Sequence, residues 1–447
     1  MGAKLGLIES FNYIREHGSP DYQNHVGVID ENTSIEVFTA PLLDYPKLFN
    51  EFAENLLQRI VYTQFLTKNI KNPLKILEGD KMPIGYAGQE IYINAAVGRD
   101  YDPDDFAGLL KKYESDVKVQ YQGINFDKQY PVTVIREKLK QAFISWNALA
   151  EYISELTKSL YDGYYIDEYN NTKAIVTRAY QSNAVQIQKV TKPTNKTTAE
   201  AFSELARTIF LNFQTPSHEY NAWHKIGGYG RFIETMCEQK DIVFLLRNDI
   251  RSKLDVTSLA NAFNLDKAEL LGRILPVNDF SIYDRKTGQK LLDGDNILGI
   301  ICDKSWFRIK EQDLYMDEGK NANNRSINFY LNAIKMFNYS YFANAVVFAT
   351  DEPEVTITGL DVSKSTVTLG KDETEDIIVT TTPYQANTPE ITAESSSTSV
   401  CTVAFDENND RKLTITAVGN GTSTVTVSAG NVSKEISVTV SGYSENV

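Results

Sequence analysis

The sequence predicts an α+β body followed by a separate all-β domain. Up to about residue 350, helix-period segments alternate with short apolar runs, whereas beyond Glu352 only short alternating strands separated by Gly, Asn, Asp and Pro remain. The charge changes at the same place. Residues 351–447 carry 15 acidic and 5 basic side chains, and the preceding 350 residues carry 44 and 40, so most of the net charge of −14 lies on the last fifth. We therefore expect a domain boundary between 350 and 353.

Composition narrows the class of protein. A chain of 447 residues with 42% hydrophobic content can form two or three domains. No apolar run reaches the length of about 18 residues that a membrane helix needs, so we expect no membrane partner. The N-terminus lacks the apolar segment of a signal peptide, and the three distant cysteines fit a reducing cytoplasm. No basic patch indicates sequence-specific nucleic-acid binding.

Helices of the body are predicted from apolar residues that recur every three or four positions. They span 46–65, 136–162, 167–180 and 198–213, and a further pair of helices, with Asp255 and Asp266 as N-caps, spans 255–272. The helix over 136–162 has one apolar stripe, and Gly163 is expected to end it; the stripe consists of Leu139, Phe143, Trp146, Leu149, Ile153, Leu156 and Leu160. Any amphipathic core helix would show the same period. Two apolar runs, 241–249 and 296–309, are expected as strands in a sheet interior.

The stretch 69–100 has a different pattern. Apolar residues alternate at Ile84, Tyr86, Ile91 and Ile93, which suggests a two-stranded ribbon. An isolated ribbon is only marginally stable in water, so a projecting one needs a partner surface. A self-assembling protein provides that surface with its next copy. The alternative is a hairpin that folds back onto its own domain.

Short motifs that could carry catalysis fail at a required position. His218-Glu219 begins a zinc-protease helix, but Ala222 stands where the second histidine ligand belongs. Asp293-Gly-Asp295 begins a calcium loop, but Ile297 occupies the place of its next oxygen ligand. We therefore expect no catalytic residue, no metal site, no cofactor and no enzyme activity.

The tail has about seven short strands at roughly ten-residue spacing, which is typical of a β-sandwich. Its core is expected to be aliphatic, formed by Val367, Leu369, Ile378, Val403, Leu413, Ile415, Val425, Val427, Ile436, Val438 and Val440. The segments VTITGLDVSKSTVTLGKDET, VTTTPYQAN, AVGNGTSTVTV and EISVTV resemble the bacterial immunoglobulin (Ig)-like domain of group 2. The resemblance assigns residues 353–447 to that family, although Thr392-Ala393 stand where the family usually has a Trp.

The body resembles the major capsid protein of small podoviruses of the Picovirinae type. The resemblance lies in the order of the blocks NPLKILEGDKMPIGYAGQEIYINAAVGRDYDPDD, LKQAFISWNALAEYISEL, KLDVTSLANAFNLDKAELLG, CDKSWFRIKEQDL and SYFANAVVFAT. It implies a Hong Kong 97-type capsid fold, α+β in class, with the Ig-like sandwich after it. It assigns 1–50 to an N-terminal arm and 51–350 to the shell domain, which would contain an extended loop over 66–104, a spine helix over 136–162 and an axial domain over about 165–300.

The resemblance also implies a function. The chain would be a major capsid protein that self-assembles as hexamers and pentamers into an icosahedral or prolate head around double-stranded DNA, with the Ig-like domain displayed outside. A separate scaffolding protein and a portal would be partners, DNA would be contacted only non-specifically, and the protein would reside in the virion after assembly in the bacterial cytoplasm. Contacts of the extended loop with a neighbouring subunit are expected at Ile84, Tyr86, Ile91 and Tyr92. The alternative is a phage tail or fibre protein with an Ig-like domain, which would contain more β structure and no long helix.

Overall fold

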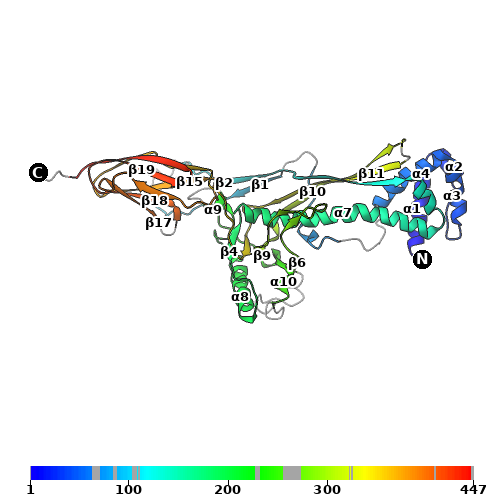
Figure 1. Cartoon of the computed structure of the whole chain (residues 1–447), viewed down its shortest axis with the longest axis horizontal. Coiled ribbons are helices and arrows are strands. Elements are labelled where there is room, and N and C mark those ends of the chain that lie inside the picture. The colour runs from blue at the N-terminus through cyan, green and yellow to red at the C-terminus, as the bar shows by residue number, and fades with distance from the viewer. Residues whose placement is uncertain are drawn as a thin grey trace. The chain divides into compact units, whose positions relative to one another are not determined.

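The computed structural model describes residues 2–62, 71–83, 88–102, 108, 111–226, 232–254, 273–321, 323, 326–406 and 409–443. The chain forms two compact units (Figure 1). Unit 1 comprises Met1–Gly88, Tyr121–Thr172 and Arg308–Asn338, and unit 2 comprises Gln89–Gln120, Lys173–Phe307 and Tyr339–Val447. Within the described residues, no helix is both long and apolar enough to cross a membrane.

Unit 1 begins with four helices, α1 (Gly2–His17), α2 (Pro20–His25), α3 (Ile35–Asp44) and α4 (Pro46–Tyr62). Serine hydroxyls cap two of them: Ser19 accepts from the N–H of Tyr22, and Ser34 accepts from that of Val37. Their buried faces meet in an aromatic core formed by Phe11, Phe38, Phe49, Phe52, Phe143 and Trp146. The predicted arm over 1–50 thus consists of helices that pack into a core, and residue 50 lies inside α4.

The predicted helix 136–162 is wrong at both its interior and its end. Two helices occupy the region, α6 (Arg136–Ala142) and α7 (Trp146–Gln181). Ser145 begins α7, because its hydroxyl accepts from the N–H of Ala148 at 3.1 Å. Gly163 does not end α7. Tyr164 directly after it is buried and extends the apolar stripe of the helix, so burial of this side chain favours continuing the helix. A glycine inside a helix costs only about 1 kcal/mol, less than the ~2 kcal/mol that burial of such a side chain provides.

A three-stranded sheet completes unit 1, in the order β10 (Phe307–Asn321), β11 (Ser326–Tyr339) and β3 (Phe126–Ile135). Strands β11 and β3 are antiparallel, with Ser326 opposite Ile135 and Lys335 opposite Phe126. A 3-10 turn, η1 (Lys75–Leu77), lies inside the stretch 69–100 for which a ribbon was predicted, and among the described residues of that stretch only Gly88–Ile93 forms a strand.

Unit 2 contains a mixed five-stranded sheet in the order β4-β12-β9-β5-β6. The strands are β4 (Gln186–Lys189), β12 (Ala345–Ala349), β9 (Ile297–Asp303), β5 (Ile242–Arg247) and β6 (Ile274–Val277). Helix α8 (Lys196–Asn212), which confirms the helix predicted over 198–213, packs Phe202, Ile209 and Phe210 into the core that this sheet contributes to. The run 241–249 is a strand as predicted. The run 296–309 instead breaks at η3 (Lys304–Trp306).

Small elements connect these strands: α9 (Trp223–Ile226), η2 (Gln239–Asp241), α10 (Asn248–Arg251), β7 (Ile282–Tyr283) and β8 (Lys290–Leu292). The pair of helices predicted over 255–272 lies outside the described residues.

The tail is a sandwich of two four-stranded sheets, coloured orange to red in Figure 1. One sheet has the order β13 (Gly359–Val362), β15 (Thr374–Thr382), β18 (Asn409–Ala417), β17 (Cys401–Asp406). The other has the order β14 (Thr366–Leu369), β20 (Val432–Val440), β19 (Gly421–Ala429), β16 (Thr392–Ser395). The aliphatic core is confirmed except at β15, where Ile377 and Val379 point inward and Ile378 does not. Val403 is only partly buried.

Candidate subunit interface

Strands β1 (Gly88–Ile93) and β2 (Val117–Gln122) form a two-stranded ribbon. The N–H of Asn94 donates to the carbonyl of Asp116 at 2.9 Å, so the end of β1 lies beside the start of β2 and the ribbon is antiparallel. Strand β2 was not predicted, although the strict alternation VKVQYQ is a signal that indicates a strand.

One face of β1 is bound to unit 2 by polar groups. The Ser340 hydroxyl donates to Glu90 Oε1 at 2.8 Å. The Tyr92 ring stacks on Phe342 with the ring centroids 5.6 Å apart, and its hydroxyl donates to the carbonyl of Glu234. Burial and the nearby Glu234 carboxylate raise the pKa of the Tyr92 phenol, which therefore keeps the proton that it donates.

The same face of β2 is also polar and is bound through the backbone of the segment after β11. The Gln120 side chain donates to the carbonyl of Tyr339 at 2.8 Å and accepts from the N–H of Tyr341 at 2.9 Å. Lys118 is buried and pairs with Asp116 at 2.5 Å. These bonds satisfy polar groups that would otherwise be costly to bury, so they fix which face of the ribbon points inward.

The opposite face of the ribbon is exposed to solvent and mostly apolar, although the polar Gln89 also lies on it, as does Tyr121. We call it the outer face and define it by Ile91 and Ile93 of β1 and Val117 and Val119 of β2. Their side chains are 57%, 63%, 48% and 37% exposed. A strand pair that covers its own domain normally turns its apolar face inward. Here the polarity is inverted, and a contiguous exposed apolar patch of this kind marks an interaction surface.

Residues 71–83, which precede the ribbon, are held in unit 1 by a buried charge cluster. Its centre is the fully buried Lys335 on β11. The Lys335 ammonium pairs with Glu168 of α7, with Glu78 at 2.8 Å and with Glu311 of β10 at 3.5 Å. Three acidic side chains on separate segments thus converge on one cation.

Two further lysines and two neutral groups complete the cluster. Lys75 lies 3.1 Å from Glu168 and 2.5 Å from Glu78, and Lys81 lies 2.8 Å from Glu311. Asn72 donates to Glu168 at 2.9 Å, and the Tyr164 hydroxyl lies 3.3 Å from both Glu168 and Glu311. Burial and the adjacent carboxylates raise the pKa of Tyr164, so its hydroxyl is a donor. Three positive and three negative charges balance each other in the cluster.

Backbone hydrogen bonds reinforce this anchor. The N–H of Gly79 donates to the carbonyl of Ile309 at 2.9 Å, and the N–H of Met82 donates to the backbone carbonyl of Glu311 at 2.8 Å. Leu74 and Leu77 are buried beside them. The first part of the predicted extended loop 66–104 is therefore anchored to unit 1 over 72–82, and the ribbon begins only after it.

The four predicted contact residues have different positions. Ile91 lies on the outer face. Tyr92 lies on the opposite face and packs within its own chain, and Ile84 and Tyr86 lie outside the described residues. Of the outer face, Ile93, Val117 and Val119 were not among the predicted contact residues. Within the described ranges, no group of three or more metal-binding side chains has the geometry of a metal site.

Comparison with known proteins identifies the families of both parts of the chain. The profile of the Phi29-like phage major capsid protein family matches residues 11–349, and that of the bacterial Ig-like domain (group 2) matches residues 356–440. The major capsid protein of Bacillus phage B103 is 27% identical over 429 residues, covering 92% of this chain and 90% of that protein. The major capsid protein of Streptococcus phage Cp-1 is 25% identical over 356 residues, covering 78% of this chain and 96% of that protein.

A solved capsid structure extends the comparison to the fold. The capsid of Staphylococcus phage Andhra aligns with a TM-score of 0.52 at 15% identity, covering 65% of this chain and 87% of that chain. These findings do not favour the alternative of a tail or fibre protein. The chain belongs to the Phi29-like phage major capsid protein family, with a Hong Kong 97-type fold followed by a bacterial Ig-like domain of group 2.

Proposed function

We propose that this chain builds the head shell by associating with its own copies as pentamers and hexamers, and that the outer face is one surface that a neighbouring copy covers. The inverted polarity of the ribbon carries the proposal. Apart from the exposed Gln89, the polar side chains of β1 and β2 point into the subunit, and the four apolar side chains of the outer face remain exposed in the single chain.

The size of the outer face fits assembly through many weak contacts. The exposed area of its four side chains together equals that of about two fully exposed aliphatic side chains. Burying one such side chain is worth about 2 kcal/mol. A contact of about 4 kcal/mol alone corresponds to a dissociation constant of about 1 mM. Such a contact does not hold two free subunits together, but it does contribute when head-to-tail contacts close into rings and rings close into a shell.

The distribution of charge suggests which parts of the chain face the packaged DNA and which face the outside. The first 350 residues are nearly balanced, with 44 acidic and 40 basic side chains, which suits a wall that contacts packaged double-stranded DNA only non-specifically. The strongly acidic Ig-like domain suits the outside of an icosahedral or prolate head. We propose a separate scaffolding protein and a portal as further partners, assembly in the bacterial cytoplasm, and a purely structural role without catalysis.

A matched pair of substitutions tests the proposal. Val117 on the outer face is 48% exposed, and Val418 in the Ig-like domain is 44% exposed. Val117→Asp and Val418→Asp each add one charge at similar exposure, so both should leave the subunit folded. Expressed with a scaffolding protein and followed by sedimentation and negative-stain microscopy, Val418→Asp should yield shells and Val117→Asp should not. Normal shells from Val117→Asp would refute the assignment of the outer face.

A further inference from the structure

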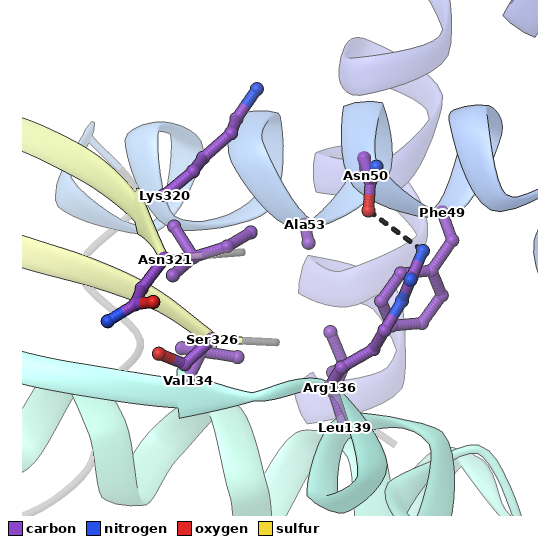
Figure 2. Close-up of a pocket in the computed structure, with 10 residues that line it drawn as sticks. Phe49, Asn50, Ala53, Val134, Arg136, Leu139, Lys320, Asn321 and Ser326 are labelled. Carbon is purple, nitrogen blue, oxygen red and sulfur yellow. Dashed lines mark hydrogen bonds between the residues drawn. The ribbon is translucent and has the colours of Figure 1, made fainter. Parts of the chain in front are cut away.

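Unit 1 contains a pocket of about 340 Å³, drawn in Figure 2, that no function described so far uses. It lies between α4, the junction of β3 with α6, and the ends of β10 and β11. Its apolar lining is formed by Phe49, Ala53, Val134, Leu139 and Ile327. The volume falls in the range of about 300–1,000 Å³ that is typical of ligand pockets.

The polar rim of the pocket contains a cation bonded only to neutral groups. Arg136 donates from Nη2 to Asn50 Oδ1 at 2.9 Å and to the carbonyl of Pro46 at 3.2 Å, and its guanidinium lies 4.9 Å from the centre of the Phe49 ring. Its Nε is buried and has no hydrogen-bond partner. Among the ion pairs of the described residues, none involves Arg136.

The two cations of the rim, Arg136 and Lys320, differ in whether they pair with a carboxylate. Figure 2 shows Arg136 directed toward Asn50 and Lys320 on the other side of the pocket. Lys320 already pairs with Glu54 at 2.5 Å. A guanidinium that pairs with no described carboxylate and lies beside an apolar cavity suits a carboxylate next to an apolar side chain, because arginine binds carboxylates through its fixed fork of donors.

The chain itself presents a segment with that chemistry. Between β1 and β2, Tyr101 is 91% exposed and Val97 is 96% exposed, and Asp100 directly precedes Tyr101. A large aromatic side chain that is almost fully exposed has no packing role in its own subunit. Tyrosine is enriched at protein interfaces because its ring is apolar and its hydroxyl bonds to a polar rim.

We propose that the pocket of one copy receives Tyr101 of a neighbouring copy, with the Asp100 carboxylate of that neighbour bound to Arg136. The Tyr101 ring fills the apolar lining, and its hydroxyl reaches the amide and hydroxyl groups of the rim. This inference rests on the proposed function, since it names where the connecting segment of the ribbon docks. It supplies a second contact in addition to the outer face.

Photo-cross-linking in assembled particles tests the docking. Tyr101 is replaced by the photoreactive aromatic analogue p-benzoylphenylalanine, and particles are assembled from equal amounts of isotopically light and heavy chains. Cross-linked peptides are identified by mass spectrometry. We expect Tyr101 to be joined to peptides of the pocket lining, from 49–53 or 134–139, in mixed light–heavy pairs. Cross-links within one copy only, to a scaffolding protein, or to other surfaces would overturn the docking.

A coupling experiment provides a second readout. Tyr101→Ser and Arg136→Gln should each lower the denaturant midpoint of particle disassembly, and the double variant should lower it no further than the stronger single variant. Lys138→Gln, which removes an exposed positive charge on the same helix outside the pocket, should not change the midpoint. Additive effects would overturn the pairing. If Val117→Asp blocks assembly while cross-linking in normal particles misses the pocket, only the docking fails and the outer face stands.

Discussion

Replacing Lys335 by methionine removes the ammonium at the centre of the buried charge cluster and keeps the length of the side chain. The Lys335 side chain is fully buried, and Glu168 beside it is 1% exposed. The substitution leaves three carboxylates facing only Lys75 and Lys81, so the cluster acquires one uncompensated negative charge. Breaking a buried ion pair in this way costs about 3–5 kcal/mol, a large share of the roughly 5–15 kcal/mol that stabilise a typical domain.

Hydrogen exchange read by mass spectrometry is the appropriate assay, because a chain with several domains does not unfold in a single two-state transition. We expect Lys335→Met to accelerate exchange in residues 72–82 by on the order of 100-fold or more, since each 1.4 kcal/mol is a factor of ten. Residues of the Ig-like sandwich should exchange as in the unsubstituted chain.

Lys189→Met serves as the control. Lys189 pairs with Asp351 at 2.8 Å, but both side chains are about 60% exposed, and exposed pairs contribute about 0–1 kcal/mol. If Lys335→Met changed exchange over 72–82 no more than Lys189→Met changes it around its own site, the cluster would not be the anchor described above.

Two further predictions concern pH and core packing. Burial alone would raise the pKa values of Glu168 and Glu311, but the lysines of the buried charge cluster outweigh burial and hold both below the ordinary 4.5. Because these pKa values are lowered in the folded state, the cluster stabilises unit 1 above pH 4.5 and loses that contribution as the pH falls through the folded values. The protection of residues 72–82 against hydrogen exchange, measured relative to an unfolded chain at each pH from 7 to 3, should therefore fall at low pH. Protection that does not change with pH would contradict this. In the sandwich, Ile377→Ala should destabilise by about 2–5 kcal/mol and Ile378→Ala by much less, as measured by exchange in β15, and equal effects would refute the observed strand orientation.

The helical part of the fold was only partly predictable: helices were located around α4, α6, α7 and α8, but α1, α2 and α3 were not predicted, and the limits of the helix over 136–162 were wrong. The apolar stripe of α7 continues through Tyr164, yet the next buried positions, Glu168 and Thr172, are polar and conceal the period. The buried Glu168 pairs with Lys335, and the two residues are 167 positions apart in the chain. No local pattern reveals such a pair, so Gly163 had the sequence signature of a helix end.

The ribbon shows a second limit of sequence analysis. Alternation identifies a strand but does not tell which of its two faces points inward. Ile91 would by composition be the inward residue and Tyr92 the outward one. The structure has the reverse, because the acceptor for Tyr92 and the backbone groups for Gln120 come from Glu234 and the segment after β11. The same ambiguity between Ile377 and Ile378 explains the error in the sandwich core.

The central claim is that the outer face is covered by another copy in the shell, and hydroxyl-radical footprinting tests it most directly. Side-chain oxidation is measured for free subunits and for assembled shells of the same chain. We predict that oxidation of Ile91, Ile93, Val117 and Val119 falls strongly on assembly, while that of Val418 in the Ig-like domain stays unchanged. Equal oxidation of the four outer-face side chains in shells and free subunits would contradict the account.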